Sequence, residues 1–157
     1  MASIIRSPRV AARRGFTLTE LLVVISILAM LAAVGILQLT RARIIAYEEL
    51  ALVSIRQIAR ACQFFNLANL RFPTSLTELS TANPQYLPAD LTGDGVTVDT
   101  RGYRFTYAND PPSNSFSLNA GPITPGVTGT RYFYVDQTLV MHVDQSGAAD
   151  ANDPVIP

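Results

Sequence analysis

The sequence Arg13-Arg14-Gly15-Phe16-Thr17-Leu18-Thr19-Glu20 leads directly into the apolar run LLVVISILAMLAAVGIL at residues 21–37. Only Ser26 and Gly35 interrupt the run, and no proline breaks it. With its flanking residues, the helix-compatible stretch reaches the roughly 20 residues that cross a bilayer core. Arginines and no acids precede it. The positive-inside rule therefore predicts a cytoplasmic N-terminus, with the rest of the chain beyond the membrane.

Three interpretations of this segment differ in where the chain is cut. A secretory signal peptide has an apolar run of about 7–15 residues with a small-residue cleavage site after it. Here the run is longer, although Leu31-Ala32-Ala33 resembles a weak site of this kind. An uncut single-pass anchor explains the hydrophobicity, but it gives no reason for Glu20, because a carboxylate near an apolar run is costly unless paired. Thr17 and Glu20 also have the spacing of a capping box, a purely structural reason for the acid.

The third interpretation comes from a resemblance. Residues 13–20 and the apolar residues after them resemble the cleavage and assembly signature of type IV prepilins and of type II secretion pseudopilins. The resemblance implies that a membrane-embedded prepilin peptidase cuts after Gly15 and that the new amino terminus on Phe16 is N-methylated. It also implies that Glu20 pairs with the Phe16 amine of a neighbouring subunit during assembly. Leu37 stands where many major pilins have proline, which favours a pseudopilin or minor pilin.

The resemblance also implies an organisation, a set of partners and a location. Residues 1–15 are expected to be a cytoplasmic leader, residues 16–40 the transmembrane or filament-core half of a helix, and residues 41–157 the rest of that helix with a globular domain. The expected partners are further copies in a helical filament, prepilin peptidase, an inner-membrane assembly platform and membrane lipid before assembly. The precursor is expected in the inner membrane, and the mature form in a periplasmic pseudopilus or an extracellular pilus. The alternative is an extracytoplasmic binding domain on a membrane anchor that does not polymerise.

The helix is predicted to continue well past the membrane, since no glycine or proline occurs between Ala42 and Leu70. Within it, apolar residues recur at the 4-3-4-3 spacing of one helical face: Ala51, Ile55, Ile58, Cys62 and Phe65. Beyond Pro73, a short helix at 74–79 precedes four stretches with strand character, at 103–107, 116–120, 131–135 and 138–143. We therefore predict an α+β, pilin-like fold with a small antiparallel sheet of about four strands on the outer half of the helix. Residues 148–157 are expected to be a surface tail.

Composition argues against two functional classes. After Gly15, eight arginines face twelve acids, and there is no lysine, so this part carries a charge of about −4. No nucleic-acid partner is expected, because such binding depends on neutralising phosphates. His142 is the only histidine and Cys62 the only cysteine. They are expected to be an ordinary strand residue and a small core residue, and no enzymatic activity is expected.

One motif suggests a cofactor. The sequence Asp90-Leu91-Thr92-Gly93-Asp94-Gly95 places oxygen side chains at positions 1, 3 and 5 and glycine at position 6, as a calcium loop does. Position 12, where a glutamate belongs, would be Arg101, and Asp99 is the nearest substitute. Major pseudopilins, which this chain resembles, have a calcium site in their C-terminal part, so the resemblance also favours calcium here. The expected ligands are therefore Asp90, Thr92, Asp94 and Asp99, against the alternative of a solvated polar turn.

Overall fold

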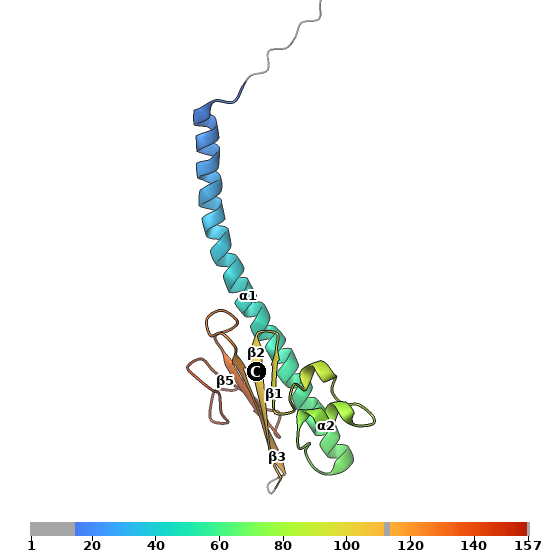
Figure 1. The fold of residues 1–157 in the computed structure, drawn as a ribbon. Helices are drawn as coiled ribbons and strands as arrows, with labels where there is room; N and C mark the ends of the chain where they lie inside the picture. Colours follow the sequence, from blue (N-terminus) through green and yellow to red (C-terminus); the bar gives the residue numbers. More distant parts are fainter. Residues whose placement is uncertain (1–14, 112–113, 157) are drawn as a thin grey trace, which may run out of the picture. The chain divides into compact units, whose positions relative to one another are not determined.

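The computed structural model describes residues 15–111 and 114–156, and all of the expected leader (residues 1–15) except Gly15 lies outside them (Figure 1). The chain divides into two compact units, Met1–Gln38 and Leu39–Pro157. One long helix, α1 (Leu18–Asn69), contributes to both units, as the unbroken helical sequence predicts. The second unit adds the helix α2 (Leu76–Thr81), the 3₁₀ helix η1 (Ala89–Leu91) and five strands: β1 (Thr97–Thr100), β2 (Tyr103–Asp110), β3 (Ser115–Pro122), β4 (Tyr132–Asp136) and β5 (Met141–Asp144).

The second unit buries the predicted face of α1 against the sheet. The five stripe residues from Ala51 to Phe65 are each at most 3% exposed. They share one hydrophobic core with inward-facing strand residues such as Phe105, Leu118 and Phe133. In Figure 1 this part of α1 runs alongside the strands. The predicted α+β arrangement is therefore confirmed.

The sheet is an antiparallel meander in which every strand pairs with its sequence neighbours, in the order β1-β2-β3-β4-β5. Buried and less buried residues alternate strictly along β3, and the buried ones are Phe116, Leu118, Ala120 and Pro122. Successive residues of a strand point to opposite faces, so one face of β3 lies in the core and the other does not. The four predicted strand stretches correspond to β2, β3, β4 and β5, which pair as the hairpins β2–β3 and β4–β5.

The sheet has one strand more than the expected four. β1 contains the single buried residue Val98 and joins β2 through the two-residue loop Arg101-Gly102. Both loop residues have positive φ, at 53° and 79°. This is the backbone requirement of a type I′ hairpin turn, which Asn-Gly usually satisfies. With arginine in the first position, the hairpin had no recognisable turn signal in the sequence.

The expected surface tail is wrong for its last residues. The backbone N–H of Val143 donates to the Pro154 carbonyl (2.9 Å), and that of Ile156 donates to the Met141 carbonyl (2.8 Å). Residues 154–156 thus pair with β5 and cover part of the open edge that it would otherwise present. Ala149 is also buried, at 4% exposure.

Cys62 is the core residue that its position predicted. Its side chain is fully buried, and burial raises the pKa of its thiol to about 12. The thiol is therefore protonated at neutral pH, and the nucleophilic thiolate is essentially absent.

Candidate processing and assembly site

The helix α1 begins at Leu18, two residues beyond the predicted cleavage position. Gly15, Phe16 and Thr17 precede α1, and the Thr17 hydroxyl oxygen accepts a hydrogen bond from the Glu20 backbone N–H (3.1 Å). Thr17 is thus the N-cap residue, and Glu20 lies at the third helical position, as the capping spacing predicts. Phe16 is 77% exposed. Cleavage after Gly15 would place a free amine on an exposed residue four positions, about one helical turn, before Glu20.

The apolar half of α1 is exposed along its length. Every residue from 15 to 36 is exposed, including large apolar side chains such as Leu21, Leu28 and Met30. Among the described residues, α1 is the one helix with the length and hydropathy to cross a membrane, and none of its most apolar window is buried within the chain. An apolar surface this long is not stable in water, so it requires lipid or other protein around it.

Glu20 is the single ionisable group in this apolar half. Among the described residues, its carboxylate has no hydrogen-bonding or ionic partner. A carboxylate in an apolar environment is costly unless a cation or hydrogen-bond donor accompanies it. The capping spacing explains the backbone bond to Thr17, but it leaves the charge itself without a partner.

Two of the four expected calcium ligands, Asp94 and Asp99, accept hydrogen bonds from other groups of the chain. Asp94 Oδ1 accepts hydrogen bonds from the backbone N–H groups of Val96 (2.9 Å) and Thr97 (2.5 Å). Both carboxylate oxygens of Asp99 accept hydrogen bonds from Arg104, at 2.7 Å each. In residues 15–111 and 114–156, no three His, Cys, Asp or Glu side chains form a group suited to a metal ion. Calcium binding by Asp90, Thr92, Asp94 and Asp99 therefore stays a prediction to be tested.

The buried carboxylate of Glu48, which no sequence pattern predicted, connects α1 to the residues that lead into β4. The Glu48 side chain, 6% exposed, accepts hydrogen bonds from the backbone N–H and hydroxyl of Thr130 (2.8 and 3.0 Å) and from Arg131 Nε (2.7 Å). Burial disfavours the carboxylate form, but these hydrogen bonds outweigh it and lower the Glu48 pKa below its ordinary value of 4.5. The partners lie more than 80 residues away in sequence, so no local pattern could identify the pair.

His142 has a structural role in the sheet. It lies in β5, and its Nδ1–H donates to the Asp153 backbone carbonyl (2.7 Å), which helps hold the C-terminal segment on the sheet. Its ring also packs edge-on against Tyr134. Both contacts are structural, as expected for a strand residue.

Comparison with known proteins identifies the N-terminal segment. Residues 11–36 match the family described as the prokaryotic N-terminal methylation motif. Neither the curated proteins nor the solved structures include a match to the chain. The matched residues contain Gly15, Phe16 and Glu20 together with most of the exposed apolar half of α1. This chain therefore carries, in residues 11–36, the N-terminal methylation motif that is the signature of type IV pilins and pseudopilins.

Proposed function

We propose that this protein is the structural subunit of an extracytoplasmic filament, either a type IV pilus or a type II secretion pseudopilus. The precursor is a single-pass inner-membrane protein, cut after Gly15 by prepilin peptidase and N-methylated on Phe16. An inner-membrane assembly platform then moves the mature chain from lipid into the filament. The role is structural and not enzymatic.

One observation carries this proposal. Glu20 lies near the start of an exposed apolar helix and has no partner for its charge within the described residues. Lipid would satisfy the apolar side chains around it, but lipid tails offer nothing to a carboxylate. A second copy with a free amine on Phe16 supplies both an apolar helix surface and a cation.

The Glu20–Phe16 pair would set the stagger between neighbouring helices. An unpaired buried charge costs several kcal/mol in proteins, and a well-placed opposite charge offsets much of that cost. The apolar side chains on either side allow many relative positions of two helices, because their contacts are not directional. The position that pairs Glu20 with the amine is then preferred, and repeating it from copy to copy generates a filament.

The alternative is an anchored binding domain that does not polymerise. It explains why the helix is apolar, but it explains nothing else about this segment. It gives the Glu20 charge no role and requires no cleavage after Gly15. Assembly separates the two functions more sharply than membrane insertion, because both predict a membrane-inserted precursor.

The test is filament formation in a host that supplies a prepilin peptidase and an assembly platform. Wild-type chain is expected to appear in filaments that are sheared from cells or recovered with the envelope, whereas Glu20→Gln is expected to be cleaved normally but excluded from them. Glu49→Gln, which removes a charge from an exposed position farther along α1, serves as the matched control and should assemble. Normal assembly of Glu20→Gln would contradict the proposed pairing, and a processed wild type that never assembles would contradict the filament function.

A further inference from the structure

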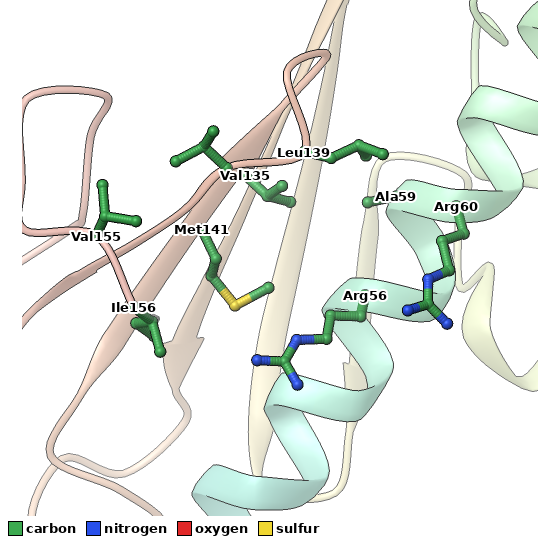
Figure 2. A pocket seen from close by; sticks show the side chains of 9 residues that line it. Arg56, Ala59, Arg60, Val135, Leu139, Met141, Val155 and Ile156 are labelled. Atoms are coloured by element: carbon green, nitrogen blue, oxygen red, sulfur yellow. The ribbon is translucent and has the colours of Figure 1, made fainter.

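Two of the arginines on α1 that have no partner among the described residues lie beside a hollow in the globular domain. Arg56 and Arg60 lie one helical turn apart and are exposed, and within the described residues neither has a hydrogen bond or an ion pair. By contrast, Arg71, Arg104 and Arg131 each pair with a carboxylate. In Figure 2 both free guanidinium groups extend from the helix on the side of a neighbouring hollow.

The hollow lies between α1 and the far edge of the sheet. Its volume is about 420 Å³, within the range of roughly 300–1,000 Å³ that is typical of binding sites. Apart from the two arginines its lining is apolar, and it includes Val135, Leu139, Met141, Val155 and Ile156. Leu139 and Val155 remain 45% and 56% exposed. A ligand that suits this hollow would carry negative charge to pair with the two arginines. It would also have small side chains that can approach the apolar lining.

The same chain has a segment of this chemistry. Residues 132–157 contain four aspartates and no arginine or lysine. Three of these aspartates, Asp144, Asp150 and Asp153, belong to the end of β5 and the loop after it, where the intervening residues include Ser146, Gly147, Ala148 and Ala151. The aspartate oxygens accept hydrogen bonds only within the same loop, such as Asp153 Oδ2 from the Asp150 N–H (2.7 Å) and Asp144 Oδ2 from Ser146 (2.8 Å). Their negative charge is thus not neutralised by any described cation.

The geometry points to an interface between copies: we propose that the hollow beside Arg56 and Arg60 receives the acidic loop 144–153 of a second copy. The two surfaces differ in charge and shape, so the contact is heterologous. A heterologous contact repeats from copy to copy and produces an open assembly when its rotation does not close a ring. The inference rests on the proposed filament function and adds a second contact between copies, formed by the globular domains.

A double-mutant cycle in the full-length chain tests the contact. The variant Arg56→Gln/Arg60→Gln removes the positive charges. The variant Asp144→Asn/Asp150→Asn/Asp153→Asn removes the negative ones while keeping an acceptor oxygen at each position. Assembled protein is measured as a fraction of the chains cleaved after Gly15, so that altered processing does not count as altered assembly. Each variant is expected to reduce assembly by about tenfold or more, which corresponds to roughly 1.4 kcal/mol per contact.

The combined variant decides the inference. If the two surfaces meet, removing both sets of charges costs little more than removing one, because the partner charges are already gone. Arg56→Lys/Arg60→Lys should retain most assembly. Arg43→Gln, which removes an exposed arginine of α1 that does not line the hollow, should be neutral. Strictly additive losses, or wild-type assembly by either charge-removing variant, would overturn the proposed contact while leaving the filament function intact. A wild-type chain that is cleaved but does not assemble would instead overturn the filament function itself.

Discussion

The two parts of α1 have the same secondary structure and different chemical surroundings. From residue 18 to 36 its side chains are exposed and almost all apolar, with Glu20 as the single charge. From residue 51 to 65 it buries one apolar stripe against the sheet and exposes polar residues such as Arg56 and Gln57. Backbone hydrogen bonds make either part a helix, but among the described residues only the second part has an apolar surface packed against it. The first part needs a partner from outside, either lipid or further copies.

The largest expected effect compares one substitution in each part of the helix. Ile55→Ala removes a fully buried side chain from the core and should destabilise the globular domain by about 2–5 kcal/mol. Leu28→Ala removes a side chain that is 57% exposed and should leave the stability of that domain unchanged within about 0.5 kcal/mol. Denaturant unfolding of the detergent-solubilised full chain, followed by tyrosine fluorescence, measures both. Equal losses would contradict the division of α1 into these two parts.

The next largest effect on stability is expected at Glu48, whose carboxylate connects α1 to the sheet. Glu48→Gln should cost about 1.5–3 kcal/mol, because it removes a carboxylate that accepts charge-assisted hydrogen bonds from Arg131 and bonds from Thr130. Since the Glu48 pKa is lowered in the folded state, its contribution is fully present above about pH 4.5 and is lost as the pH falls through the folded-state pKa.

Unfolding free energies of wild type and Glu48→Gln, measured from pH 7 to pH 3, test this sign. Their difference should be largest at neutral pH and should shrink below about pH 4.5. Glu78 and Asp99 also have lowered pKa values, each chiefly because of a hydrogen bond from an arginine. The variant should therefore still lose stability in acid, but less steeply. A difference that grew as the pH fell would contradict the assignment.

A smaller effect is expected at Gly129, which lies in close contact with the Tyr103 ring. A Cβ added to Gly129 would lie 2.0 Å from the Tyr103 hydroxyl oxygen. Tyr103 is fully buried and its hydroxyl donates to the Arg131 carbonyl (2.9 Å), so its ring has little room to move. Gly129→Ala should cost about 1–3 kcal/mol by thermal or denaturant unfolding. Gly147→Ala, where a Cβ has no atom within 4 Å, is the control and should be close to neutral.

The smallest expected effect concerns calcium. Asp99 is engaged by Arg104 and Asp94 by its own turn, so added calcium should leave the melting temperature unchanged at millimolar concentrations. Asp99→Asn should also show no calcium dependence. A calcium-induced rise in melting temperature that Asp94→Asn abolishes would instead establish the metal site anticipated from the Asp-x-Thr-x-Asp-Gly spacing.

The features that could be predicted from the sequence are those that depend on residues close together in the chain. Gly15, Phe16 and Glu20, for which cleavage and assembly roles are proposed, lie in one short motif that the family comparison also matches, and the buried stripe from Ala51 to Phe65 follows from helical periodicity. β1 was missed because its turn uses Arg101-Gly102 and the strand buries only Val98. The Glu48 cluster and the pairing of residues 154–156 with β5 depend on contacts between distant segments, which periodicity does not report.

The central claim is that the exposed apolar helix belongs to a processed prepilin, and the mass of the N-terminal peptide tests it most directly. The full chain would be expressed with and without a prepilin peptidase, purified from the membrane fraction and digested for mass spectrometry. We predict that with the peptidase the N-terminal peptide begins at N-methylated Phe16, and that without it the chain stays uncut. A chain left intact by the peptidase, or one cut beyond Ala33, would contradict the account and indicate a plain membrane anchor or a secreted domain, respectively.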